Sequence, residues 1–541
     1  MARLAISAKS GSGRISPSEL LADLRRPNSE LAVLDLREEG RFANGHILLA
    51  SSLPLSRLEL DVAGLVPRRA TRIVLCDDND GLAQVATNRL GSLGYNEIVR
   101  LGGGMPAWSA AGYEIFRGLN IPSKVLGLYA QEQLGIPEIG PEDLAALQAG
   151  DADVRIIDCR PFQEYQRGCI PGARHCPGVE LVRQLTDFGA SGNSQLVVNC
   201  AGRTRGLLGA QMLIDAGFAG KVAALRDGTM GWELSGRELE LGATRTFNYR
   251  SPNAGKSMAT TAKKIRKRLG IPIIDGESLD RWRSDRTRTI YLFDIRGRAA
   301  YETGHIAGAR HVAGGQLIQN FDQHVATRGA RIVLSDDDGV RATSTALWLR
   351  RMGWRDVAVA LADGSAGTLE AGPEAPLRVR PPPDRDYVSA QELKVMLDGG
   401  TVLLVDLATS RNYKSGHIPQ AWFAVRSRLA KVLGLLPKAK TLVLTSDDGI
   451  LAAFAGKDEL AFAGVVRVLE GGTAAWQRAG NPLCASLDRL IDKPDDVVLK
   501  PSELGEGRKA AMREYLSGSK GLLEKAARDG TLHLAALPVQ Q

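Results

Sequence analysis

The chain repeats one pattern of apolar and polar positions four times. In each repeat a short apolar run ends in an aspartate, a polar stretch follows, and a small turn-forming segment comes soon after. The marker aspartates are Asp35, Asp158, Asp294 and Asp406. The turn-forming segment reads Gly-His-Ile at residues 45–47, 304–306 and 416–418, and Gly-Cys-Ile at 168–170. Such self-similarity at a fixed period indicates an array of related units.

Two further landmarks recur at nearly constant distance from each marker aspartate. A second apolar run falls at residues 73–75, 196–198, 332–334 and 442–444. A glycine-containing turn then follows at 102–103, 227–228, 363–364 and 471–472. Agreement at three landmarks in four copies indicates four tandem units of one fold.

Within each copy, short β-branched runs alternate with helical stretches such as 82–93 and 207–216. Buried strands that alternate with helices are typical of a parallel sheet covered on both faces. The sequence therefore predicts an α/β protein of four tandem domains, each an open, mostly parallel sheet flanked by helices. Sheets of this kind bind ligands at the carboxyl ends of their strands.

The domain boundaries are placed where the pattern lapses, one such place being the Pro-rich stretch 381–383, which predicts a stiff spacer. The predicted domains are residues 10–118, 134–243, 270–371 and 387–486, followed by a helical tail at 487–541.

Composition narrows the class of protein further. No apolar run approaches the ~20 residues that a membrane span needs, and residues 1–18 lack the apolar core of a signal peptide. Six cysteines in 541 residues are too few for a disulfide framework, and none forms a CxxC pair that would favour zinc. We therefore expect a cytoplasmic protein with free thiols, without a membrane partner and without a bound metal.

The net charge of +8 mildly favours anionic partners. One basic cluster, at residues 263–268, lies in a segment that predicts an entry helix to the third copy. Such a cluster is usually the solvated face of a helix, so we do not expect a nucleic-acid partner. Gly255-Lys256-Ser257 ends like a phosphate-binding loop but lacks the required upstream glycine, which excludes a nucleotide site of that type.

Candidate chemistry gathers in copy two, in the loop after the second apolar run. It reads Cys200-Ala201-Gly202-Arg203-Thr204-Arg205-Gly206 and directly precedes a predicted helix. A thiol at a helix N-terminus meets unpaired backbone N–H groups and the positive end of the helix dipole. With Arg203 and Arg205 nearby, we expect the pKa of Cys200 to be lowered, and the same amides suit an anion.

This loop, with Asp158-Cys159-Arg160 upstream and Asp227-Gly228-Thr229-Met230-Gly231-Trp232 downstream, resembles the rhodanese (sulfurtransferase) family. The other three copies resemble the same family in their aspartate and Gly-His-Ile landmarks. The resemblance implies that Cys200 is catalytic and takes up a sulfane sulfur as a persulfide. The loop amides would cradle that sulfur, Arg205 would orient the donor anion, and Arg203 would assist at the rim. Asp158 and Arg160 match supporting ion-pair positions.

The activity that the resemblance implies is transfer of sulfur from thiosulfate, or a related persulfide donor, to cyanide or a thiol. This chemistry needs no organic cofactor and no metal. An interaction scaffold or sulfur carrier stays open as an alternative. A cysteine phosphatase is disfavoured, because such enzymes use a longer loop than the six residues from Cys200 to Arg205. The sequence specifies no oligomeric state.

The corresponding loops of the other copies look inactive. Copy one is aligned through Cys76, which three carboxylates follow closely; copies three and four carry Ser335 and Thr445 at the aligned place, each before an Asp-rich turn. Nearby carboxylates disfavour a thiolate and repel an anionic donor. The Asp-rich loops are too short for an EF-hand calcium site, and we expect solvated turns.

Copy two also carries Cys169 where the other copies have His46, His305 and His417, which we expect to be structural hydrogen-bonding residues. A sulfur relay through Cys169, Cys159, Cys176 or Cys76 is left open.

Overall fold

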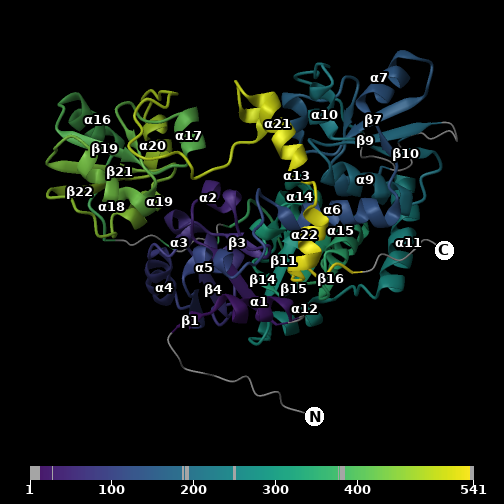
Figure 1. Ribbon diagram of the computed structural model, residues 1–541, viewed down its shortest axis with the longest axis horizontal. Coiled ribbons are helices and arrows are strands. Elements are labelled where there is room, and N and C mark those ends of the chain that lie inside the picture. The colour runs from purple at the N-terminus through teal and green to yellow at the C-terminus, as the bar shows by residue number, and fades with distance from the viewer. Residues whose placement is uncertain are drawn as a thin grey trace, which may run out of the picture.

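A computed structural model describes residues 13–26, 29–184, 188, 194–247, 252–375, 377, 380 and 384–535. It contains four α/β units in the predicted order and a C-terminal tail (Figure 1). The main sheet of each copy pairs its own strands in parallel, which confirms the predicted fold class. Residues 10–12 of the first predicted domain and the 381–383 spacer lie outside the described residues.

Copy one has a sheet in the order β1-β5-β4-β2, with β3 also paired to β2. All five residues of β2 are buried, as expected for a strand covered on both faces. Its strands are β1 (Arg14–Ile15), β2 (Leu31–Asp35), β3 (Ala50–Ser52), β4 (Ile73–Cys76) and β5 (Ile98–Leu101). Its helices are α1 (Pro17–Arg25), α2 (Glu39–Asn44), α3 (Leu58–Leu65), α4 (Leu82–Ser92) and α5 (Gly104–Ala110).

Copy two follows a linking helix, α6 (Ile121–Leu134), and has the strand order β6-β10-β9-β7-β8. Its strands are β6 (Glu138–Ile139), β7 (Val154–Asp158), β8 (Arg174–His175), β9 (Gln195–Asn199) and β10 (Lys221–Leu225). Its helices are α7 (Pro141–Ala149), α8 (Phe162–Arg167), α9 (Thr204–Asp215) and α10 (Gly228–Leu234). The predicted helix at 207–216 is therefore present as α9.

Copy three is entered through α11 (Pro252–Leu269), the helix predicted around the basic cluster. Its main sheet has the order β13-β11-β15-β16. Its strands are β11 (Ile290–Asp294), β12 (His305–Ile306), β13 (Arg310–His311), β14 (Thr327–Arg328), β15 (Arg331–Asp336), β16 (Val357–Leu361) and β17 (Leu369–Glu370). Its other helices are α12 (Gly276–Ser284), α13 (Arg298–Thr303), α14 (Gly314–Gln319) and α15 (Val340–Arg351).

Copy four has the order β18-β22-β21-β19-β20. Its strands are β18 (Tyr387–Val388), β19 (Val402–Asp406), β20 (Trp422–Phe423), β21 (Thr441–Thr445) and β22 (Val465–Leu469). Its helices are α16 (Ala390–Asp398), α17 (Ser410–Ser415), α18 (Leu429–Val432), α19 (Ile450–Ala455) and α20 (Gly472–Arg478).

The four copies are joined more closely than a string of separate domains. Strand β14 of copy three pairs antiparallel with β2 and so extends the sheet of copy one. One continuous apolar cluster runs from copy two into copy three and contains Leu196, Leu207, Phe293 and Trp348. Copy four docks on copy one through buried Arg426, whose guanidinium donates to Glu59 (Nη1···Oε2 2.7 Å). The copies thus form one assembly.

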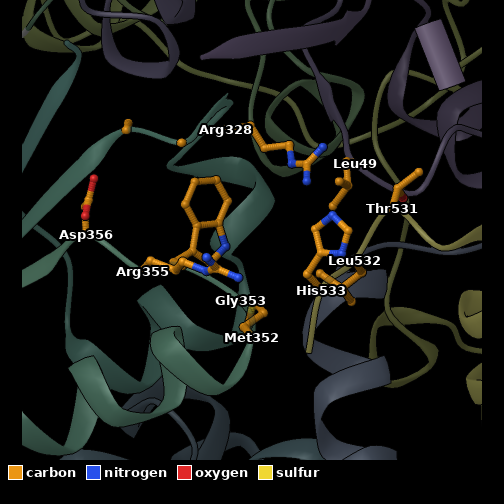
Figure 2. Close-up of a pocket in the computed structure, with 12 residues that line it drawn as sticks. Leu49, Arg328, Met352, Gly353, Arg355, Asp356, Thr531, Leu532 and His533 are labelled. Atoms are coloured by element: carbon orange, nitrogen blue, oxygen red, sulfur yellow. The ribbon is translucent and has the colours of Figure 1, made fainter. Parts of the chain in front are cut away.

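The tail contains α21 (Arg508–Ser517) and α22 (Leu522–Asp529). It leaves copy four, reaches α10 of copy two and then runs along α6 (Figure 1). Its last described residues line a pocket between copies one and three, where His533 and Leu532 lie beside Gly353 (Figure 2). Across the described part of the chain, no helix combines the length and apolarity needed to cross a membrane.

Candidate active site

Cys200 lies between the end of β9 and the start of α9, at the carboxyl edge of the sheet in copy two. Its side chain is buried, with 2% of its surface exposed. The sulfur accepts hydrogen bonds from the backbone N–H groups of Gly202 and Gly206. The cysteine thus sits in the amide cradle that a strand-to-helix loop provides.

The downstream Asp-Gly-Thr-Met motif at residues 227–230 holds this loop in place through backbone hydrogen bonds. The backbone N–H of Thr229 donates to the Cys200 carbonyl (2.8 Å), and that of Met230 donates to the Ala201 carbonyl (3.1 Å). Gly228 has φ +56°, and a Cβ at this position would lie 2.2 Å from the Cys200 carbonyl oxygen. Only glycine allows so close an approach, so the motif fixes the position of the cradle.

The predicted lowering of the Cys200 pKa is wrong in its net direction. Burial raises the pKa of the thiol, and the nearby Arg205 guanidinium and the amides of Gly206 and Gly202 only partly offset that rise. The sequence identified the groups that favour the thiolate but could not show how completely the loop removes the sulfur from water. Desolvation disfavours the charged form, and here it is the largest effect.

The two arginines of the loop have different partners. Arg203 pairs with Asp227 at the rim (Nε···Oδ1 2.6 Å). Arg205 pairs with Glu164 of α8 (Nη2···Oε2 3.0 Å) and also donates to Gln316 of copy three (Nη1···Oε1 3.4 Å). The cation nearest the thiol is therefore held by two different copies.

Glu164 links Arg205 to the tail. The Lys500 ammonium lies 2.8 Å from Glu164 Oε1. Although burial alone would raise it, the pKa of Glu164 falls to about 2 because Arg205 and Lys500 both stabilise the carboxylate. Glu164 is consequently charged throughout the physiological pH range.

Thr204 and the ion pair of Asp158 and Arg160 complete the predicted set. Thr204 begins α9 and packs against Gly127 of α6, where an added Cβ would lie 3.2 Å from the threonine methyl. Arg160 forms a two-pronged pair with Asp158 (Nη2···Oδ2 2.6 Å, Nε···Oδ1 2.9 Å) and also donates to the Gly168 carbonyl. This buried pair ties the end of β7 to the Gly-Cys-Ile segment.

The strand register corrects the alignment of the four loops by one residue. Parallel pairing places Asp35 beside Cys76 and Asp158 beside Asn199, and likewise Asp294 beside Ser335 and Asp406 beside Thr445. Cys76 therefore corresponds to Asn199 and not to Cys200. The residues that occupy the place of Cys200 are Asp77, Asp336 and Ser446.

The side chains of these three residues accept a hydrogen bond from the backbone N–H six residues later, as Cys200 does from Gly206. The backbone N–H of Ala83 donates to Asp77 Oδ2 (3.0 Å), and that of Ala342 donates to Asp336 Oδ2 (3.0 Å). In copy four the Ala452 N–H donates to Ser446 Oγ (3.3 Å). An acidic or hydroxyl oxygen thus fills the cradle in every copy except the second, where a thiol fills it.

The Asp-rich loop of copy three is only in part the solvated turn that we expected, since Asp337 is exposed and Asp336 is buried. Asp336, Asp337 and Asp338 offer carboxylate oxygens within 4.8 Å of one another. Asp336 is buried and caps α15, however, while Asp337 pairs with Arg341 (2.5 Å) and Asp338 with Arg183 (3.0 Å). Existing amide and arginine partners account for these carboxylates.

The other cysteines of copy two divide between the faces of the sheet. Cys159 shares an apolar cluster with Cys200 and Val198, whereas Cys169 belongs to a cluster with Val197 and Trp232. Neighbouring strand residues point to opposite faces, so Cys169 lies across the sheet from Cys200. Direct sulfur exchange between Cys169 and Cys200 is therefore blocked by the sheet itself.

The histidines of the other copies are structural, as predicted. In each, Nδ1 lies within hydrogen-bond distance of a carbonyl four residues earlier; the pairs are His46 with Phe42 (2.9 Å), His305 with Tyr301 (2.8 Å) and His417 with Tyr413 (2.8 Å).

Four residues around the site were missed by the sequence analysis: Glu164, Gln316, Lys500 and Tyr515. Tyr515 of α21 lies over the loop, where a Cβ on Gly202 would be 3.2 Å from its ring. Only Glu164 is close in sequence to a recognised motif, and three of the four come from copy three or the tail. No local signal in the sequence connects them with Cys200.

Comparison with known proteins identifies the family. The model of the rhodanese-like domain matches residues 16–111, 140–235, 277–369 and 389–479. The chain belongs to the rhodanese-like family, with four copies of its domain.

The relatives include proteins with a sulfurtransferase name. A crystal structure of a thiosulfate sulfurtransferase from Pseudomonas aeruginosa is 40% identical, with a TM-score of 0.92 over 97% of this chain and 100% of that one. A thiosulfate sulfurtransferase from Azotobacter vinelandii is 28% identical over 34% of this chain and 81% of its own length. These similarities confirm the prediction of a sulfurtransferase-like enzyme.

One further relative is named as a transcriptional regulator and not as a sulfurtransferase. An HTH-type transcriptional regulator from Mycobacterium tuberculosis is 32% identical over 21% of this chain, and the chain spans 50% of the regulator's length.

Proposed function

We propose that copy two transfers sulfane sulfur through a persulfide on Cys200. The proposal rests on the position of the Cys200 sulfur. This atom faces the backbone amides of Gly202 and Gly206 at the N-terminus of α9, and the Arg205 cation lies nearby. These groups stabilise negative charge on a sulfur atom or on a bound anion.

In the first half-reaction the Cys200 thiolate attacks the outer sulfur of thiosulfate. The S–S bond of the donor breaks, sulfite departs with the bonding electron pair, and Cys200 carries a persulfide. In the second half-reaction an acceptor nucleophile, cyanide or a thiolate, attacks the terminal sulfur and the Cys200 thiolate is regenerated. No redox partner is consumed, and ping-pong kinetics are expected.

Arg205 has two tasks in this scheme. Its charge offsets part of the desolvation of the Cys200 thiolate, and it offers donors for the sulfonate oxygens of thiosulfate. The donor must compete with Glu164, which holds Arg205 in place before binding.

The amide cradle is suited to an anion in this particular protein. Copies one and three place the carboxyl groups of Asp77 and Asp336 where copy two places the Cys200 sulfur. The loop of this chain thus offers backbone N–H donors to an acidic group at that point, as it would to a thiolate or persulfide.

A supporting, non-enzymatic role fits copies one, three and four. Asp77, Asp336 and Ser446 stand where the nucleophile stands in copy two, so these copies lack the thiol that the reaction needs. A cysteine phosphatase is disfavoured, because α9 begins at Thr204 and leaves only a short loop after Cys200.

We also infer a reducing, cytoplasmic location. All six cysteines are free thiols, five of them buried. A chain with no disulfide in these positions is adapted to a compartment in which thiols stay reduced.

The test is the release of sulfite and thiocyanate from thiosulfate and cyanide, with the wild type compared with Cys200→Ser and Cys76→Ser. Activity should disappear in Cys200→Ser and persist in Cys76→Ser, because Cys76 ends a strand outside the cradle. Mass spectrometry after thiosulfate alone should show one added sulfur on the peptide with Cys200. Full activity of Cys200→Ser would overturn the proposal.

A further inference from the structure

The tail after copy four is attached to the candidate active site by ion pairs. Lys500 contacts Glu164, the partner of Arg205, and Arg508 contacts Glu233 of α10 (Nη2···Oε1 2.6 Å). Between them Glu503 pairs with Arg411 of copy four (3.1 Å). The chain segment before α21 is thus held on both copy four and copy two.

Tyr515 brings an aromatic wall directly against the nucleophile loop. Its ring lies so close to Gly202 that an added Cβ would be 3.2 Å from Cε1, and Leu516 follows at 3.8 Å. The Lys124 ammonium of α6 sits 4.5 Å from the centre of the same ring. Burial raises the pKa of the Tyr515 hydroxyl. The charges of Arg205 and Cys200 also act on that hydroxyl, which agrees with a position beside the nucleophile loop.

The rest of the tail is held in place by further contacts, so the Tyr515 ring has a fixed position at the site. Leu522 and Ala526 of α22 share an apolar cluster with Phe116 and Val125. Arg528 pairs with Glu114 of copy one (2.8 Å).

At the far end the tail closes onto copy three. A Cβ on Gly353 would lie 2.3 Å from the His533 carbonyl, and the Ala535 N–H donates to the Arg351 carbonyl (2.9 Å). Gly353, Leu532 and His533 are seen together in Figure 2. The tail is consequently held on both sides of Tyr515.

The charges at the site favour a small anion. Four cations, Lys124, Arg203, Arg205 and Lys500, lie around the loop. Glu164 pairs with Arg205 and Lys500, Asp227 pairs with Arg203, and Asp322 interacts with Lys124. Excess positive charge in a confined cleft attracts anionic substrates.

We propose that Tyr515 is a specificity-determining residue of copy two, which restricts the acceptor to a small anionic nucleophile such as cyanide or a low-molecular-weight thiolate. A thiol on a folded protein carries a bulky surface that the aromatic wall over Gly202 excludes. The inference rests on the proposed persulfide chemistry of Cys200 and adds the acceptor class to it.

The experiment loads Cys200 with thiosulfate and measures transfer to cyanide, glutathione and a reduced protein dithiol of thioredoxin size. Wild type should use the two small acceptors and be poor with the protein dithiol. In Tyr515→Ala the ratio of kcat/KM for the protein dithiol to that for cyanide should rise about 10-fold or more, the scale of a steric pocket effect. Tyr515→Phe should keep the wild-type ratio, because the ring and not the hydroxyl forms the wall.

Tyr387→Ala is the matched control, since Tyr387 and Tyr515 are equally exposed (38%) and Tyr387 lies in copy four. Alkylation of Cys200, followed by peptide mass spectrometry, gives a second readout. The rate at which a bulky maleimide alkylates Cys200 should increase more in Tyr515→Ala than the rate for iodoacetamide does.

Efficient transfer from wild type to the protein dithiol, or an unchanged ratio in Tyr515→Ala, would overturn this inference while leaving the persulfide chemistry intact. Failure of wild type to form any persulfide would instead refute the proposed function.

Discussion

Cys200 of copy two and Asp77 of copy one occupy the same position in their repeats. Each is the first residue after its strand, and each side chain accepts a hydrogen bond from a backbone N–H in the first turns of the next helix, from Gly206 and Ala83 respectively. The same loop is therefore present four times in one chain, and its amide cradle holds a different side chain in different copies. The cradle accepts a carboxyl group twice, a hydroxyl once and a thiol once.

This equivalence predicts that Cys200→Asp folds normally but is inactive. The carboxylate can take the place that Asp77 and Asp336 take, with Arg205 nearby as a counter-charge. The melting temperature should stay within about 3 °C of wild type, which corresponds to ~1 kcal/mol in a domain of this size. Calorimetry with Cys200→Leu as the comparison tests the point. The leucine leaves the Gly206 N–H without its acceptor and should lower stability by about 1–3 kcal/mol; an equal loss in both variants would contradict the cradle argument.

Removal of the Arg205 charge should raise the pKa of Cys200 further. Burial already raises that pKa and the guanidinium partly offsets it, so Arg205→Ala shifts the pH profile of Cys200 alkylation to higher pH. The kcat/KM for thiosulfate should fall by about 10²–10³-fold, the usual effect of losing one preorganised donor to an oxyanion. Arg205→Lys keeps the charge but not the forked geometry and should be intermediate. Arg203→Ala is the control, with a smaller effect, since Arg203 pairs with Asp227 at the rim.

The fold could be predicted because each element is encoded locally. The apolar run at 73–75 became β4, the run at 442–444 became β21, and the helical stretch at 82–93 became α4. The ends of the strands were harder to locate, because Cys76, Ser335 and Thr445 are buried residues at or next to the ends of their strands, and their types do not distinguish a strand from a loop. That ambiguity produced the shift of one residue between Cys76 and Cys200.

The candidate site could be predicted only where its parts are contiguous in the chain. The loop from Cys200 to Gly206 and the Asp158–Arg160 pair are local motifs. Gln316, Lys500 and Tyr515 reach the site through contacts between copies and through the tail. Nothing in the pattern of a single repeat specifies how four repeats pack, so such residues need a structure.

Lys500 should increase the affinity for the donor. It shares Glu164 with Arg205, and without it the carboxylate would hold Arg205 more strongly against an incoming anion. Lys500→Ala should raise the KM for thiosulfate about 3- to 10-fold at low ionic strength, and less at high salt, because exposed charges are screened. Steady-state kinetics at two salt concentrations measure the effect. Lys509→Ala, an exposed lysine on the same tail, should leave the KM unchanged; equal changes in the two variants would point to net charge alone.

The interface between copies one and four should weaken as the pH rises. Glu38 of copy one is buried there and accepts hydrogen bonds from Ser427 (2.8 Å) and Ser56 (3.0 Å). Burial raises the pKa of Glu38 from 4.5 to about 7. Between these two values the unfolded chain ionises while the folded chain keeps its proton, so stability falls with rising pH across that window and stays low above it.

Replacement of Glu38 by glutamine removes this ionisation and keeps the shape of the side chain. Glu38→Gln should therefore gain ~1–3 kcal/mol over wild type at pH 8, since each pKa unit corresponds to about 1.4 kcal/mol. At pH 5 the gain should nearly vanish, because Glu38 is then mostly protonated in the folded protein. Melting temperatures of both proteins at the two pH values measure the difference, with exposed Glu277→Gln on α12 as the control. A gain of the same size at pH 5 and pH 8 would show that hydrogen bonding or packing, and not the buried charge, limits the stability of this interface.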